Sequence, residues 1–198
     1  MSENRFGSEG SSSPELNRYR LLLEITNTVA GAESLADAFE KLAPPVLDLT
    51  EGELLSLSLH DSSRNRMVTQ YWKRNQESGA FAAPPDEAAT GWVWKHQELL
   101  AIPDTQQERR FPGCLGVLPG EGVRSYTVLP MSTPSSRFGA LGLGKSIPAV
   151  LNSEDVEFLS TVAELTALAL EKTRSHRAFE EQQITSRSML FPQRRSRP

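Results

Sequence analysis

The run Gly139–Ser146 places the tightest limit on how this chain can fold. Its spacing matches G-x-x-x-x-G-K-S, a phosphate-binding loop, which needs a strand entering its first glycine and a helix starting at its Lys-Ser end. Here residues 133–138 have the composition of a turn, and Pro148 stands where that helix would have to be under way. We therefore interpret Phe138–Lys145 as a strand whose glycines leave room for another backbone or helix, and keep nucleotide binding as a second alternative.

The composition is that of an ordinary globular chain without covalent cross-links. Hydrophobic residues make up 38% and charged residues 23% of the 198 residues, which allows one domain with a real core. Cys114 is the only cysteine, which excludes an internal disulfide and fits a reducing cytoplasm. The Ser- and Gly-rich residues 1–13 predict a disordered tail rather than a signal peptide, and no apolar run is long enough to span a membrane.

Charge is spread unevenly along the chain. The net charge of −4 by itself indicates no polyanion partner. Residues 184–198 nevertheless carry arginines and no acid, and a basic tail can contact nucleic acid. Because Phe191 is the only aromatic residue beside these arginines, we interpret residues 178–198 as the end of an exit helix and a disordered basic tail, and expect no direct nucleic-acid binding.

Apolar periodicity divides the rest of the chain into helices and strands. We expect helices at 14–30, 34–49, 88–97 and 153–177, and strands at 53–60, 67–72, 99–102, 124–131 and 138–145. Pro44 and Pro45 predict a kink or a break in the second helix. Residues 73–87 and 104–122 are expected to be loops. The order predicts an α+β sandwich around a mostly antiparallel sheet.

The first and last helices carry different apolar surfaces. The last helix is apolar nearly all round from Val156 to Leu170, so we expect it to be buried against the sheet and against another helix or a partner chain. Asn152 or Ser153 is expected to cap its start. In the first helix, the expected buried stripe contains Leu16, Tyr19, Leu22, Leu23, Thr26, Val29 and Ala30.

The order of elements and several short runs resemble a GAF domain over residues 14–177. The runs that carry the resemblance are 50–61, 99–104 followed by Arg110-Phe111, Ser-Tyr-Thr-Val-Leu-Pro at 125–130, Gly-Ala-Leu-Gly at 139–142, and 158–169. Within the family, the chain is most similar to the N-terminal sensory domains of sigma-54-dependent bacterial transcriptional regulators of the formate-hydrogenlyase-activator type. Those regulators continue into an AAA+ ATPase and a DNA-binding domain that this sequence lacks, so we expect either a piece of a longer regulator or a free-standing module.

The resemblance implies a three-layer sandwich with a six-stranded antiparallel sheet. The terminal helices would cover one face, and loops with a short helix would form a ligand pocket on the other. It also implies a homodimer through residues 14–30 and 153–177, for which the two-sided apolar surface of the last helix is independently suited.

Specialised members of the family carry chemistry that this sequence lacks. Bilin-binding members attach the chromophore through a cysteine that is often followed by histidine, whereas Cys114 is followed by Leu115. Members that reduce free methionine sulfoxide need several cysteines, and the Asn-Lys-Phe-Asp-Glu motif of cyclic-nucleotide-binding members is absent. His60-Asp61 has no further histidine at metal-ligand spacing. We therefore expect no catalytic residue, metal or cofactor.

A small set of side chains could line the expected pocket. Aromatic rings supply contact area, two strand hydroxyls can orient a polar ligand, and a carboxylate with a guanidinium can bind a small acid or zwitterion. For each of them, ordinary core packing, a satisfied hydroxyl or a solvated loop is the competing interpretation. The candidates are Tyr71, Trp92, Trp94, Asp104, Arg109, Phe111, Ser125 and Thr127.

The leading hypothesis is a non-catalytic sensory module. It would bind a small molecule or a partner and relay that event through the terminal helices to an output domain in transcription regulation. The alternative is a structural dimerisation module whose pocket is filled by its own side chains.

Overall fold

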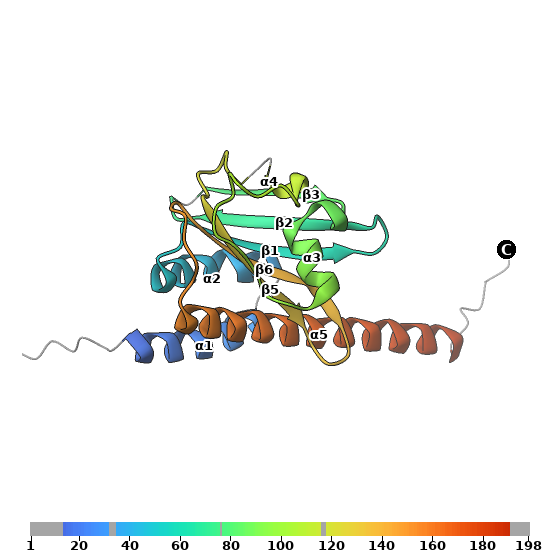
Figure 1. Cartoon of the computed structure of the whole chain (residues 1–198). Helices are drawn as coiled ribbons and strands as arrows, with labels where there is room; N and C mark the ends of the chain where they lie inside the picture. The colour runs from blue at the N-terminus through green and yellow to red at the C-terminus, as the bar shows by residue number, and fades with distance from the viewer. Residues whose placement is uncertain (1–13, 32–34, 76, 116–117, 191–198) are drawn as a thin grey trace, which may run out of the picture.

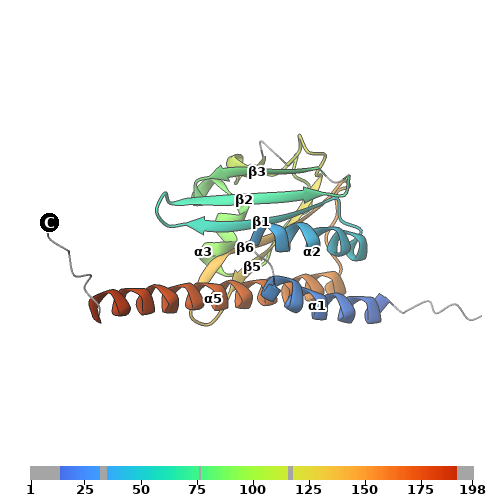
Figure 2. The same ribbon diagram turned by 180° about the vertical axis from the view of Figure 1, so that it is seen from behind.

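The computed structural model describes residues 14–31, 35–75, 77–115 and 118–190, which form three layers (Figure 1, Figure 2). A six-stranded sheet is the middle layer. One face is covered by α1 (Pro14–Gly31), α2 (Leu35–Thr50) and α5 (Ser153–Leu190). The other face is covered by α3 (Ala89–His96), α4 (Pro112–Leu115) and the neighbouring loops. The predicted α+β sandwich is confirmed, while the expected disorder of 1–13 and of the last residues lies outside the described ranges.

The sheet has the strand order β3-β2-β1-β6-β5-β4, and each neighbouring pair is antiparallel. The strands are β1 (Leu54–Asp61), β2 (Arg66–Lys73), β3 (Ser78–Ala83), β4 (Leu100–Ile102), β5 (Ser125–Ser132) and β6 (Arg137–Lys145). Because successive side chains point to opposite faces, β5 places Leu129 in the cluster under α5 and Val128 in the cluster under α3. The same strands therefore contact both helical layers.

Strand β3 corrects the expectation of a loop over 73–87. Its sequence, Ser-Gly-Ala-Phe-Ala-Ala, has little intrinsic preference for strand, which is why the pattern does not reveal it. The segment becomes a strand because it pairs with β2 over its whole length, from Met67 opposite Ala83 to Trp72 opposite Ser78. Tertiary pairing outweighs local propensity here, and the sheet reaches the six strands that the resemblance implies.

Helix α2 runs through Pro44 and Pro45 without the break that the two prolines predict. Each proline removes a backbone donor that would bond four residues earlier, to the carbonyls of Glu40 and Lys41. Both of these residues are exposed, so water can reach that side of the helix. The opposite side packs into the core through buried apolar residues such as Val46, and this packing holds the helix together.

Strand β6 occupies the run that matches the phosphate-binding pattern. It pairs with β1 on one side and with β5 on the other. After β6 ends at Lys145, the next helix begins only at Ser153. A Cβ at Gly142 would lie 2.1 Å from Tyr126 Oη, and one at Gly139 would lie 1.8 Å from the Ser58 carbonyl oxygen. The predicted strand is confirmed, the glycines admit close neighbours as expected, and the phosphate-binding alternative is contradicted by the missing loop and helix.

Helix α1 turns a different face to the core from the predicted one. Leu21 and Ile25 are buried, whereas Tyr19 and Leu23 are 70% and 68% exposed. The predicted stripe and the buried face are both helically spaced, and Leu22 of the predicted stripe packs partly against the core. Thr26, Val29 and Ala30 of that stripe lie outside the residues whose side chains are described. The pattern could not decide between them, because it records which residues are apolar and not what each side meets.

Helix α5 begins at a side-chain cap and runs to Leu190, beyond the domain boundary predicted at 177 and into the range expected to hold the end of the exit helix. Asn152 Oδ1 accepts a hydrogen bond of 2.7 Å from the backbone N–H of Asp155, which confirms Asn152 as the cap. The Asp155 carboxylate also accepts a hydrogen bond of 2.5 Å from Arg18 of α1, and Arg18 lies over the ring of Phe158. These contacts fix the starts of the two terminal helices side by side.

Candidate functional site

The candidate site is the sheet face beneath α3, where the sequence predicts a pocket. An apolar cluster fills most of this layer and includes Val93 of α3, Ile102 of β4 and Phe111 of the loop. The described parts of the following segment, residues 104–115 and 118–124, contain α4 and contribute Leu118 and Val123 to this cluster. The layer is therefore built from one helix, one long loop and the inward side chains of the sheet.

Two groups of hydrogen-bonded hydroxyls lie in this layer on the sheet side. Ser58 of β1 hydrogen-bonds to the hydroxyl of Thr69 in β2, and it donates to Thr90 of α3 over 3.1 Å. Ser56, one pleat along β1, lies 2.6 Å from the hydroxyl of Tyr126 in β5. All five residues are buried. Because hydroxyls both donate and accept, this surface can recognise a polar molecule, but in the described structure its members bond one another.

Three of the four aromatic candidates, Tyr71, Trp92 and Trp94, lie at different places around this layer. The Tyr71 hydroxyl donates to Glu121 over 3.1 Å, and its ring packs against the cluster. Trp92 packs partly on the same cluster and stacks on His96 at a ring-centre distance of 4.4 Å. Trp94 lies farther along α3, where it stacks on His60 at 3.8 Å. Tyr71 and Trp92 thus edge the candidate site, and Trp94 belongs to the outer end of α3.

Phe111 is the candidate most deeply inside the layer, with 3% of its surface exposed. Its ring sits in the apolar cluster under α3, where a ligand of the predicted pocket would be bound. A buried phenylalanine at this place supplies the packing that a ligand would otherwise supply. This observation favours the interpretation of a pocket filled by the chain itself.

The charged candidates of the long loop are bonded within their own segment or to its base. Asp104 accepts from Arg124 over 3.3 Å and from the backbone N–H of Gln106, while Arg109 donates to the carbonyls of Gln106 and Glu108. Hydrogen bonds from the Arg110 side chain to both carboxylate oxygens of Glu108 lower the pKa of that carboxyl to about 2. The expected carboxylate and guanidinium groups are present, but they hold the loop in shape.

Ser125 and Thr127 lie on the other face of the sheet. They share the parity of Leu129, which is buried in the cluster under α5, and Ser125 Oγ donates to the carbonyl of Ile147 over 2.8 Å. This placement separates both hydroxyls from the predicted pocket. The hydroxyl of β5 that does reach the α3 side belongs to Tyr126, the residue between them.

A polar clasp joins the loop to β2 at the edge of the site. Glu121 accepts hydrogen bonds from Tyr71 and from Lys73, the latter over 3.1 Å. Burial and the hydrogen bond to Glu121 raise the pKa of Tyr71. The hydrogen bonds to Glu77 and then to Glu121 raise the pKa of Lys73. The clasp keeps the turn at 118–122 against the sheet.

Several residues of the site have no distinctive sequence signal. Ser56 and Ser58 alternate with leucines, which predicts a strand but not what covers the serine face. Thr69, Thr90 and Glu121 stand in segments without any motif. Within the described ranges, no group of three or more His, Cys, Asp or Glu residues is placed to hold a metal ion, and no helix is long and apolar enough to cross a membrane.

Sequence comparison relates most of the chain to one family. The model of the GAF domain family matches residues 32–171. The dual 3',5'-cyclic-AMP and -GMP phosphodiesterase 11A of Takifugu rubripes is 23% identical over 189 residues, which cover 89% of this chain. The chain spans 21% of the length of that relative.

Solved structures with the same fold come from proteins of varied description. The GAF domain of a phosphoenolpyruvate-protein phosphotransferase from Coxiella burnetii superposes with a TM-score of 0.68, at 18% identity over 84% of this chain and 99% of that one. Free methionine-R-sulfoxide reductase from Neisseria meningitidis, in complex with its substrate, gives 0.66, at 17% identity over 89% and 99%. The phycocyanobilin-bound GAF domain of a cyanobacterial phytochrome gives 0.63, at 15% identity over 81% and 97%. These superpositions establish the fold. The family match over most of the sequence shows that the chain belongs to the GAF domain family.

Proposed function

We propose that this chain is a cytoplasmic, non-catalytic regulatory module that relays the state of its α3-side layer through α5 to an output domain. GAF domains are generally sensory or regulatory. The observation that supports the proposal is the shared sheet, because β5 and β6 carry side chains into both the α3 layer and the α5 layer. The output that we propose is transcription regulation of the sigma-54-dependent kind, which rests on the resemblance of residues 14–177.

The ligand that suits the α3-side layer is a small polar molecule. The hydroxyls of Ser56, Ser58 and Thr90 offer both donors and acceptors, and the apolar cluster beside them would cover the rest of a ligand. Binding would have to exchange their mutual hydrogen bonds for bonds to the ligand. Phe111 and the clasp at Glu121 would have to move for it to enter, which connects ligand binding to loop position.

Screening by thermal shift tests this proposal. A ligand of this layer at about 100 times its dissociation constant is expected to add about 2.7 kcal/mol of stability and to slow amide exchange over 104–124. Thr90→Val, which removes one buried hydroxyl, is expected to abolish the shift. Ser63→Ala, in the exposed turn after β1, is the matched control and is expected to retain it. If no compound gives a shift and native mass spectrometry finds no co-purified molecule, ligand binding is contradicted.

A structural dimerisation module without a ligand is the second candidate, and a specific observation favours it. The hydroxyls under α3 bond one another, and Phe111 is buried among apolar neighbours. A blank ligand screen together with a stable dimer is the result that this candidate predicts. A ligand that protects residues 104–124 would exclude it.

In both candidates, we propose a homodimer through residues 14–30 and 153–177. Leu16, Tyr19 and Leu23 recur at helical spacing on the exposed side of α1. Beside them, α1 and α5 enclose a groove of about 510 Å³ lined in part by Leu22 and Phe158. A two-fold pair of such surfaces is self-complementary, because the stripe of each copy meets the groove of the other.

Introducing negative charge on the exposed stripe of α1 tests the dimer. Leu16→Glu combined with Leu23→Glu is expected to convert the dimer into a monomer, because four buried carboxylates would face apolar surface. Leu99→Glu changes a leucine that is also exposed but lies directly before β4, and it is expected to leave the dimer intact. Sedimentation equilibrium separates these outcomes. A wild-type protein that is monomeric at every concentration contradicts the proposed dimer.

A further inference from the structure

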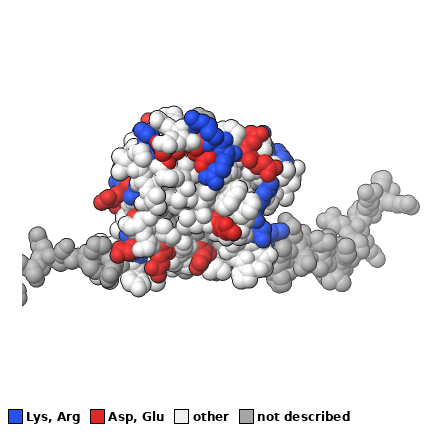
Figure 3. Space-filling view, in the orientation of Figure 1, with Lys and Arg blue, Asp and Glu red and all other residues white. Residues whose placement is uncertain are grey.

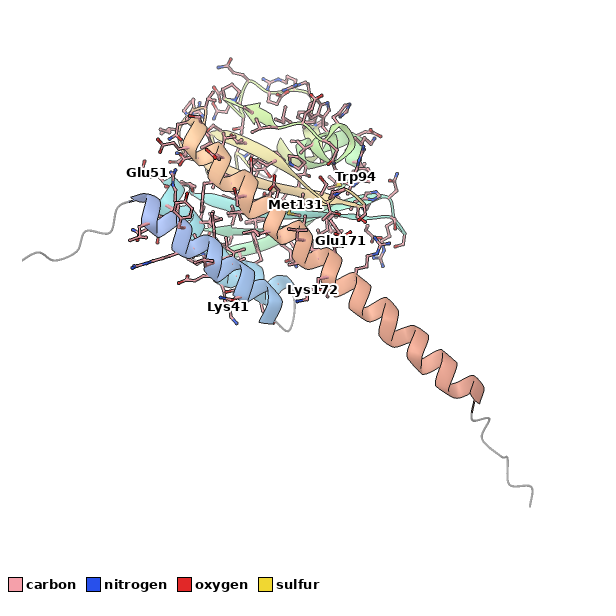
Figure 4. The ribbon with its side chains drawn as sticks, turned by 90° about the horizontal axis from the view of Figure 1, so that it is seen from below. Lys41, Glu51, Trp94, Met131, Glu171 and Lys172 are labelled. Atoms are coloured by element: carbon pink, nitrogen blue, oxygen red, sulfur yellow. The ribbon has the colours of Figure 1, made fainter. Side chains whose placement is uncertain are left out.

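The turn between β5 and β6 lies between the outer end of α3 and the point where α5 leaves the sheet. Figure 4 shows Trp94 of α3, Met131 of β5 and Glu171 of α5 at this end of the molecule. Figure 1 and Figure 2 both show the hairpin running alongside α5 there. Met131 is fully buried in the cluster that the sheet shares with α5. One hairpin therefore meets both helical layers.

On the α3 side, Arg137 forms a reciprocal pair of hydrogen bonds with the helix. Trp94 Nε1 donates to the Arg137 carbonyl over 3.3 Å, and Arg137 Nη1 donates to the carbonyl of Lys95 over 2.8 Å. The last carbonyls of a helix lack partners within the helix and carry partial negative charge, so a guanidinium is a favourable cap. Arg137, the first residue of β6, thus attaches that strand to the end of α3.

On the α5 side, Ser135 attaches the same turn to Glu171. Its hydroxyl donates to the Glu171 carboxylate, and Thr133 Oγ1 lies 3.1 Å from Ser135 Oγ. The backbone N–H of Thr133 donates to the Ser136 carbonyl over 2.8 Å, which closes the turn. Glu171 directly follows Leu170, the last α5 residue that packs partly against the core within the range where side chains are described, and Lys172 is exposed.

We infer that the β5–β6 turn is the element that couples α3 to the exit of α5. Only Ser136 separates the attachment to α3 at Arg137 from the attachment to α5 at Ser135, and the closed turn leaves little freedom between them. A displacement of α3 therefore changes how Glu171 is held. This inference rests on the proposed regulatory function, because it names the route by which the α3-side layer regulates α5.

Amide hydrogen exchange over residues 166–175 tests the coupling in the ligand-free chain. Ser135→Ala is expected to speed exchange there about two- to tenfold, which is the effect of losing one typical hydrogen bond. Trp94→Phe keeps an aromatic ring but removes the N–H donor, and it is expected to speed exchange in the same segment although it lies on α3. The double variant is expected to match Ser135→Ala alone, because the second change acts through the first.

Two matched variants complete the test. Ser63→Ala removes a serine hydrogen bond of the same kind in the β1–β2 turn and is expected to leave residues 166–175 unchanged. Glu171→Gln keeps an oxygen acceptor for Ser135 and is expected to have a smaller effect than Glu171→Ala. If Trp94→Phe alters exchange in α3 only, or if the two single effects add, the coupling is overturned. A blank ligand screen would contradict ligand sensing but leave this result standing, so the two failures are distinguishable.

Discussion

Gly142→Ala is expected to lower the free energy of unfolding by about 3 kcal/mol, a large fraction of the roughly 5–15 kcal/mol that stabilises a typical domain. The added Cβ would lie 2.1 Å from Tyr126 Oη and 2.6 Å from Ser56 Oγ, in the centre of a sheet buried on both faces. Neither neighbour can move without disturbing the hydrogen bond between the Ser56 and Tyr126 hydroxyls. Urea unfolding followed by circular dichroism measures the change.

Two further variants show whether this cost arises from contact with Tyr126. In a Tyr126→Leu background, which removes the two closest atoms but leaves Ser56 Oγ, Gly142→Ala is expected to cost at least about 1 kcal/mol less than in the wild type. Equal costs in the two backgrounds would contradict the contact. Lys145→Ala, at the position where a phosphate-binding loop has its essential lysine, is expected to change stability by less than about 0.5 kcal/mol.

Ile25→Ala is expected to destabilise the protein by about 3 kcal/mol, because it leaves a cavity in the core where α1 packs on α2 and α5. Ile25 is fully buried. Leu23→Ala, two residues earlier, removes a similar volume from an exposed position. Measured below the concentration at which the protein associates, Leu23→Ala is expected to cost less than about 0.5 kcal/mol. A larger stability loss for Leu23→Ala than for Ile25→Ala would contradict the observed buried face of α1 and support the stripe that the sequence predicts.

The fold was predictable where each local pattern has one physical interpretation. Alternating leucines and serines indicate a strand at β1, and a turn before β6 with Pro148 after it favours a strand over a phosphate-binding loop. The α2 prolines show the opposite case. Local chemistry predicts a break, but packing of the buried face outweighs two missing backbone hydrogen bonds whose carbonyls face water.

The candidate site was predictable in place but not in residue detail. The sequence predicts aromatic and charged residues around the α3 layer, and Tyr71, Trp92 and Phe111 do border or fill it. It does not predict which face of β5 is turned toward α3. A shift of one residue exchanges Thr127 for Tyr126, and only the pairing of β5 with β6 fixes that choice.

The length of α5 beyond the sheet amplifies small changes in its tilt. At about 1.5 Å per residue, the axis between Glu171 and Leu190 extends about 30 Å beyond the contact between Glu171 and Ser135. A tilt of about 10° at Glu171 would therefore move the helix axis at Leu190 by about 5 Å. Rearrangements too small to alter the sheet would still be large at that distance. The mechanical advantage of the helix, rather than the size of any change within the domain, would then set the amplitude available to whatever α5 contacts.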